Sequence, residues 1–411
     1  MRLVEIRAGL TGARLARSVR ASRHELLLRA GERLTPTMLR HLERRGVTQV
    51  YVNDAYLPDI APDADVDEAT RELLNETLHK AMDSVAEGDR LDIGSVQSAA
   101  AGLTRELGAQ PSVLFSLSRL RAVDEATVQH SVNVAILAML AAGHFGLTPD
   151  ERTALGMGAL LHDVGKTLVP TEVLRKPGPL TDEEWAQMRR HPALGHSLIV
   201  ERAKGVEARV AEVALRHHER IDGRGYPDGL RDAQIDLFPR LTMVADVWDA
   251  MVSARWYKPS FPFAYVATHM RQSRGLDPEA VEALLARVAL FPTGSLVRLT
   301  SGSLAWVVGQ DPLRPAMPIV MILTDTDGGP VTPYLAELAG GTTHVQDLLP
   351  DLPDAVQAHC RAHSTTIARA LEQLRLEVPE AERARQAASG GPQTEGRAGT
   401  QVGERGDGWQ P

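Results

Sequence analysis

Five histidines and two aspartates in the middle of the sequence have the residue types of a metal site. Taken singly, each has an ordinary structural explanation, because histidines and His-Asp pairs at helix ends are common hydrogen-bonded core or rim groups. An aspartate in an apolar helix is a stronger signal, since burying an unpartnered carboxylate is costly. The candidate ligands are His130, His162, Asp163, His191, His217, His218 and Asp246.

Taken together, the imidazoles and carboxylates match the needs of two divalent ions. Such a mixture suits Fe, Mn, Co, Ni or Zn, whereas Mg or Ca would require oxygen ligands throughout. Neighbouring helical residues point about 100° apart, so His162 and Asp163 can bracket two ions, the carboxylate bridging them. Ions about 3.5–4 Å apart can clamp an in-line phosphoryl displacement, and they lower the pKa of a bridging water whose hydroxide attacks phosphorus.

The elements that position these residues are predicted to form an all-helical domain over residues 111–290. Alternating strand patterns are absent from this part of the sequence, and the turns between helical stretches are short. Helical periodicity recurs over 125–143, 150–165, 181–190, 192–203, 206–218, 239–253, 262–274 and 277–290.

Residues 1–56 predict a small α/β unit in front of this domain. Thr35 is expected to cap a helix that begins at Pro36 and ends at Gly46. The short β-branched run Val47–Val52 predicts a strand.

Residues 57–110 are predicted to be a linker and a helical segment. The linker is rich in Pro and Asp, and helical spacing follows from Glu68 to about Gly108. This segment either packs onto the neighbouring domain or forms a stalk or dimerisation helix.

Residues 291–376 predict a β-rich appendage followed by a helix. The β-type runs are 296–299, 304–308 and 319–323, and the helical pattern returns at 353–376. The tail at 377–411 is polar and Gly-rich, and we expect it to be disordered. The predicted fold class is therefore mainly α, with a small N-terminal α/β unit and a small C-terminal β appendage.

Composition excludes several other classes of protein. Cys360 is the only cysteine, so a disulfide scaffold, a zinc-thiolate site and a cysteine-ligated iron–sulfur cluster are excluded within one chain. The net charge of −8 argues against general binding of long nucleic acids. We expect a cytoplasmic protein, because neither a signal peptide nor a membrane-spanning run of about 20 apolar residues is visible.

The stretch from about Val123 to Leu290 resembles an HD-GYP domain, the bacterial cyclic di-GMP phosphodiesterase branch of the HD superfamily. The HD-x-GK motif is complete from His162 to Lys166, and VADVWDAM around Asp246 is similar to a later family segment. The segment HHE-x2-DG-x-GYP-x-GL is complete as His217, His218, Glu219, Asp222, Gly223, Gly225, Tyr226, Pro227, Gly229 and Leu230. Residues 1–56 also resemble a small domain often found before HD-GYP domains.

This resemblance implies an HD-type helical bundle that binds two divalent ions, Fe or Mn before Zn, Co or Ni. The seven candidate ligands would hold the ions, with Asp163 as the bridging carboxylate. Asp163 and Lys166 would act in catalysis, Lys166 by neutralising charge near the scissile phosphate.

The resemblance also implies substrate-binding residues. Arg255 and Lys258 would bind the phosphates of the dinucleotide, although solvated surface charge is the simpler explanation from spacing alone. The turn Gly225–Pro227 would shape the rim of the pocket, where Gly225 gives backbone freedom, Tyr226 lines the rim and Pro227 fixes φ.

The sequence departs from the family pattern at a few positions. Ala126 stands where some members have a glutamate that binds a third metal, so we expect two ions. Ala254, Trp256 and Leu276 replace the more usual Asp, Pro and Phe. These departures leave all the candidate ligands in place.

The resulting hypothesis is a phosphodiesterase that opens cyclic di-GMP to pGpG, with onward hydrolysis to GMP left open. The alternatives are a non-catalytic cyclic-dinucleotide sensor or protein-interaction module on the same fold, and another HD-superfamily phosphohydrolase. The expected partners are cyclic di-GMP and either a second copy of the chain or a signalling protein.

Overall fold

The computed structural model describes most of the chain up to residue 374. The described residues are 1–20, 26–45, 47, 49–53, 57–58, 60, 66–109, 126–174, 176, 178–203, 205–252, 263–311, 314, 316–338 and 343–374. Contacts group Met1–Ile367 as one compact unit and Ala368–Pro411 as a second. The described residues are mainly helical, with small sheets near both ends of the sequence, which confirms the predicted fold class. The domain boundaries within residues 1–376 stay predictions.

The N-terminal unit has a small hydrophobic cluster of its own, which includes Leu15, Leu34 and Leu42. Its elements are β1 (Arg2–Glu5), η1 (Ala8–Leu10), β2 (Arg14–Leu15), β3 (Val19–Arg20), β4 (Leu26–Leu28), α1 (Pro36–Arg44) and β5 (Gln49–Asn53). One antiparallel sheet has the order β1–β5–β2, and β3 pairs with β4. The predicted cap is confirmed, because the Thr35 hydroxyl accepts a hydrogen bond from the Met38 amide. Gly46 lies outside the described residues.

Two helices, α2 (Glu68–Ala86) and α3 (Ile93–Ala109), replace the continuous helical segment expected from the sequence. The chain turns at Gly88, whose φ of 86° is in the left-handed region that favours glycine. Leu74, Leu78 and Leu103 belong to the same hydrophobic cluster as the helices that follow. The packing alternative therefore agrees with the structure.

The helical bundle contains the candidate ligands. Its elements are α4 (Ala126–Ala141), η3 (Ala142–His144), α5 (Pro149–Leu161), η4 (Val164–Leu168), α6 (Thr171–Leu174), α7 (Asp182–Met188), α8 (His191–Arg202), α9 (Ala208–Arg216), η5 (Asp232–Gln234), α10 (Leu237–Val252), α11 (Phe263–Gln272) and α12 (Pro278–Leu285). Capping boxes fix two of the starts, Thr148 with Glu151 at α5 and Thr181 with Glu184 at α7.

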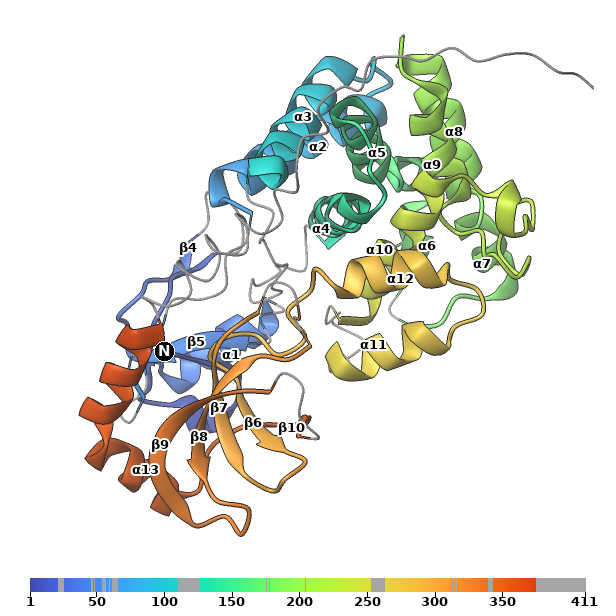
Figure 1. Ribbon diagram of the computed structural model, residues 1–411. Helices are drawn as coiled ribbons and strands as arrows, with labels where there is room; N and C mark the ends of the chain where they lie inside the picture. Colours follow the sequence, from blue (N-terminus) through green and yellow to red (C-terminus); the bar gives the residue numbers. More distant parts are fainter. Residues whose placement is uncertain are drawn as a thin grey trace, which may run out of the picture. The chain divides into compact units, whose positions relative to one another are not determined.

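The helices of the bundle pack against one another (Figure 1). Helix α4 contacts α5 and α10, and α5 contacts α9. Helix α8 contacts both α9 and the short η4 that follows α5. Among the described residues, no helix combines the length and apolar character needed to cross a bilayer.

The C-terminal sheet is antiparallel, with the strand order β10–β6–β7–β8–β9. The strands are β6 (Leu296–Leu299), β7 (Leu304–Gly309), β8 (Ile319–Thr324), β9 (Pro330–Glu337) and β10 (Val345–Leu349). The three predicted β-type runs correspond to β6, β7 and β8. Helix α13 (Asp354–Ala362) follows, and the predicted disordered tail lies outside the described residues.

Candidate metal centre

The seven candidate ligands come from five parts of the helical bundle. His130 lies in α4 and Asp246 in α10, while His191 begins α8. His162 is the residue at which α5 ends, and Asp163 follows it. His217 likewise ends α9, and His218 comes next. Most of the ligand positions are therefore helix ends, where the backbone can present adjacent side chains in different directions.

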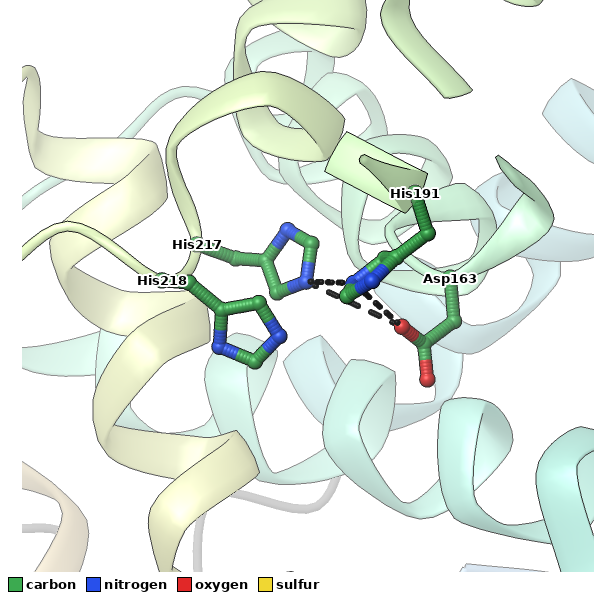
Figure 2. A group of neighbouring side chains, drawn as sticks. All are labelled: Asp163, His191, His217 and His218. Atoms are coloured by element: carbon green, nitrogen blue, oxygen red, sulfur yellow. Dashed lines mark hydrogen bonds and ion pairs between the residues drawn. The ribbon is translucent and has the colours of Figure 1, made fainter. Parts of the chain in front are cut away.

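These side chains form two adjacent groups. Asp163, His191, His217 and His218 make the first group, which Figure 2 shows converging from separate segments. His130, His162 and Asp246 make the second group. Within each group, one potential ligand atom per residue lies within 4.8 Å of the others.

Asp163 is buried between the two groups, and each of its carboxylate oxygens faces a different one. Oδ1 lies 3.3 Å from Nε2 of His191 and 3.7 Å from Nε2 of His217. Oδ2 lies 3.4 Å from Nε2 of His162 and 4.0 Å from Nε2 of His130. This is the arrangement expected of a carboxylate that bridges two cations.

Backbone carbonyls orient three of the imidazole rings in the same way. Nδ1 of His162, His191 and His217 lies 2.7, 2.7 and 2.9 Å from the carbonyl oxygen three residues earlier. A carbonyl can only accept, so each Nδ1 carries a proton, and in the neutral imidazole Nε2 then keeps the lone pair. The last carbonyls of a helix lack partners within the helix, so its end can supply this anchor. Each anchor turns Nε2 toward Asp163.

The arrangement of these lone pairs fits a bound cation. Nε2 of His191 and Nε2 of His217 lie 3.3 Å apart, and both are acceptors. A cation between them removes their repulsion. Nε2 of His162 and Oδ1 of Asp163 are fully buried without a hydrogen-bond partner, although buried polar atoms are normally satisfied. The side chains therefore fit a metal centre made of nitrogen and oxygen ligands.

Protonation in the group formed by Asp163, His191, His217 and His218 also suits metal binding. Burial lowers the pKa of His191 to about 4 and that of His218 to about 3, and it lowers the pKa of His217 well below its ordinary value. Burial alone would raise the pKa of Asp163, but Lys166 and His162 hold it well below the ordinary value. Neutral imidazoles and an ionised carboxylate are the forms that bind metal.

His130 is held differently, between two aspartates of α10. Its Nε2 lies 3.0 Å from Oδ1 of Asp246, and its Nδ1 lies 2.6 Å from Oδ2 of Asp249. Burial alone would lower the pKa of His130, but its hydrogen bonds to Asp246 and Asp249 raise that pKa to about 9. Asp249 was not among the candidate residues. The sequence did hold a signal, because Asp249 follows Asp246 by three residues and Asn133 follows His130 by three. This spacing puts the two residues of each pair about one helical turn apart on the same helix face.

Lys166 reaches the centre from η4. Its ammonium group hydrogen-bonds Oδ2 of Asp163, and its side chain stays 26% exposed. A cation that touches both the buried carboxylate and solvent can meet an anionic ligand entering from outside. Arg255 and Lys258, the other predicted phosphate binders, lie outside the described residues.

The loop after His218 folds around the buried carboxylate of Glu219. Its two oxygens accept hydrogen bonds from the amides of Asp228, at 2.7 Å, and Leu230, at 3.0 Å. The ring of Tyr226 stacks on His218 with a centroid separation of 4.8 Å, and the guanidinium carbon of Arg189 lies over the Tyr226 ring, 4.6 Å from its centroid. The sequence motif included Glu219 without assigning it this role.

Gly225 has a different structural role from the one expected. The left-handed backbone of this loop lies at Gly223, with φ 80°, and Gly229, with φ 65°. A Cβ atom on Gly225 would lie 2.3 Å from both the Arg220 amide nitrogen and the Cα of Glu219. Close backbone approach, rather than backbone freedom, therefore requires glycine at this position.

Glu219→Gln is expected to destabilise the fold by about 1–3 kcal/mol, because one loop amide then faces an NH2 group instead of an acceptor. Chemical denaturation of the variant and the wild-type protein measures the difference. Glu207→Gln is the matched control, since Glu207 is exposed at the start of α9 and makes no capping hydrogen bond. Equal stability of Glu219→Gln and the control would contradict the role given to the Glu219 carboxylate.

Comparisons with known proteins match the part of the chain that contains this centre. Residues 106–280 match the family model described as HD domain. The chain is 43% identical over 201 residues to "Cyclic di-GMP phosphodiesterase PA4108" of Pseudomonas aeruginosa, covering 49% of this chain and 48% of that protein. It is 42% identical over 180 residues to "Cyclic di-GMP phosphodiesterase response regulator RpfG" of Xanthomonas campestris, covering 41% of this chain and 47% of that protein.

Among solved structures, the chain resembles one described as Bd1817, an HDG"Y"P protein from Bdellovibrio bacteriovorus. The TM-score is 0.44 at 18% identity, covering 69% of this chain and 98% of that chain. The chain spans about half the length of the two curated relatives named above.

Proposed function

We propose that this protein is a metal-dependent phosphodiesterase that hydrolyses cyclic di-GMP, because residues 106–280 match the HD domain model and the sequence carries complete HD and GYP motifs. The observation that carries the proposal is the position of Asp163, whose two oxygens face two separate groups of histidines. The names of the curated relatives support the substrate. The expected first product is pGpG, with GMP as the product of a second cleavage.

The two groups of side chains would each hold one divalent ion. His191, His217 and His218 would hold the first ion. His130, His162 and Asp246 would hold the second, and Asp163 would be shared between them. Fe or Mn is the expected metal, because mixed imidazole and carboxylate ligands suit both, and Zn, Co and Ni are the alternatives.

When bound, the two ions would lower the pKa of the attacking water and offset the negative charge that builds on the phosphoryl oxygens. The chain itself supplies the positioning. Lys166 would bind a non-bridging phosphate oxygen beside Asp163 and stabilise the same charge. Tyr226 would hold the His218 ring in place from the rim through its stacking contact. Arg255 and Lys258, from the sequence motif, would bind the dinucleotide's phosphates.

A turnover assay on the full chain tests this proposal. Protein purified without oxygen and loaded with Fe²⁺ or Mn²⁺ is incubated with cyclic di-GMP, and the products are separated by chromatography. Formation of pGpG by wild type but not by His162→Ala supports the proposal. Absence of turnover, with equal binding of cyclic di-GMP by both proteins, would instead favour the non-catalytic sensor.

Lys166→Ala is expected to retain bound metal and to lower kcat about 10²–10³-fold, the usual effect of removing one group that stabilises transition-state charge. Metal content and steady-state kinetics measure the two effects separately. Lys80→Ala, at an exposed position of α2, controls for the general loss of a lysine. A wild-type kcat in Lys166→Ala would remove this lysine from the catalytic mechanism.

A further inference from the structure

Asp249 is a fully buried carboxylate that joins α10 to α4. One of its oxygens, Oδ2, lies 2.6 Å from Nδ1 of His130. The other, Oδ1, accepts a hydrogen bond of 3.0 Å from the side-chain amide of Asn133. Asp249 is 0% exposed, and none of the proposed metal-binding or catalytic roles includes it.

The hydrogen bonds continue from Asn133 to a third helix. The Asn133 side-chain oxygen accepts from Arg71 of α2 at 3.4 Å and from Gln129 at 3.2 Å. These donors fix which way the Asn133 amide points, so its NH2 group faces Asp249. Donors and acceptors therefore alternate along the buried series Arg71, Asn133, Asp249 and His130.

His130 needs such a partner because of its place in the fold. His162, His191 and His217 have backbone carbonyls as anchors for Nδ1. His130 lies inside α4, where backbone carbonyls are used by the helix itself, so its Nδ1 requires an acceptor from another element. Asp249 is that acceptor.

We infer that Asp249 is a positioning residue that holds the proton on Nδ1 of His130 and thereby presents the Nε2 lone pair to a metal ion. This inference rests on the proposed metal binding. A carboxylate that accepts the second ring N–H of a ligand histidine fixes the ring and raises its basicity. Asp249 acts through His130, and its loss should therefore weaken metal binding at the group formed by His130, His162 and Asp246.

Asp249→Asn tests the inference with little change in volume. If the new amide turns its oxygen to His130, its NH2 group faces the NH2 group of Asn133. If it turns the other way, its NH2 group donates to Nδ1 and leaves the proton on Nε2, where it opposes metal. Both orientations break the alternation of donors and acceptors from Arg71 to His130. We therefore expect Mn²⁺ to bind about 10–100-fold more weakly at the group formed by His130, His162 and Asp246.

The double variant Asp249→Asn with Asn133→Asp should restore binding. Asn at 249 then donates to Asp at 133 and still accepts from His130, while Asp at 133 accepts from Arg71 and Gln129. Asn133→Asp alone should not improve Mn²⁺ binding, because it places two carboxylates against each other. If Asp249 were needed only for packing, the second substitution would not restore Mn²⁺ binding.

The measurements are Mn²⁺ affinity by competition with a chromogenic chelator, and bound metal per chain. Asp277→Asn is the matched control, because Asp277 is a 9% exposed carboxylate that caps α12 and pairs with Arg240. It should lower stability without changing Mn²⁺ affinity.

Wild-type Mn²⁺ affinity in Asp249→Asn, or a double variant no better than the single one, would overturn the inference and leave the proposed function standing. Wild-type protein that binds Mn²⁺ without hydrolysing cyclic di-GMP would instead contradict the proposed function, while the affinity comparison still decides the role of Asp249. Failure of wild type to bind either Mn²⁺ or Fe²⁺ would overturn both.

Discussion

Asp163→Asn is expected to abolish hydrolysis of cyclic di-GMP and to reduce the bound metal. The substitution keeps the volume of the side chain but removes the charge that faces both groups of histidines. The loss of turnover should exceed the roughly 10²–10³-fold that follows removal of one electrostatic stabiliser, because the proposed bridging ligand would serve two ions. Metal analysis and product chromatography on the same preparation measure both effects.

Asp150→Asn is a matched control for this experiment. Asp150 is an exposed residue in the first turn of α5, the helix that ends at His162. It should retain full metal content and activity. Circular dichroism of both variants checks that they are folded. Full activity with retained metal in Asp163→Asn would show that the metal centre is misassigned.

Gly165→Ala is expected to damage the fold and the metal centre together. A Cβ atom at this position would lie 2.0 Å from the carbonyl oxygen of His191 and 2.5 Å from the backbone nitrogen of Gly195. Both are backbone atoms of α8, so η4 and α8 would have to separate, moving Asp163 away from His191. We expect a loss of about 3 kcal/mol or more in the free energy of unfolding, at the upper end for overpacked sites.

Gly102→Ala provides a control of opposite sign. A Cβ atom there would meet only the end of the Arg105 side chain, at 3.9 Å. Alanine in a helix is more stable than glycine, so this variant should gain about 0.5–1 kcal/mol. Chemical denaturation and metal content measure both variants. A Gly165→Ala protein with wild-type stability and metal content would contradict the close packing of η4 on α8.

Local sequence signals predicted much of the helical bundle. Helical periodicity over 150–165 and 181–190 predicted the helices found as α5 and α7. Thr148 and Thr181, each followed three residues later by glutamate, are the caps at their starts. The expected roles of His162 and Asp163 stay predictions, and in the structure Nε2 of His162 lies 3.4 Å from Oδ2 of Asp163. Such features depend on residues close together in sequence.

Other features were harder to predict for identifiable reasons. Strand β9 carries Pro330 and Pro333 and is largely exposed, so it lacks the apolar run that indicated its neighbours. The break between α2 and α3 was not predicted, although residues that favour it are present in the sequence. Gly88 adopts a left-handed conformation, and Oδ1 of Asp92 accepts a hydrogen bond from the Ser95 amide. Asp249 was missed because its role depends on the register between α4 and α10, which no local pattern encodes.

The anchoring of the rings makes the two halves of the metal centre unequally robust to mutation. The carbonyls that hold His162, His191 and His217 belong to the main chain, so replacing the side chains of Ala159, Met188 or Ala214 leaves these acceptors present. The acceptor that holds His130 is a side chain, and a single codon change can delete it. In a lineage that is no longer selected for turnover, we therefore expect the half of the centre between α4 and α10 to lose its ability to bind metal first.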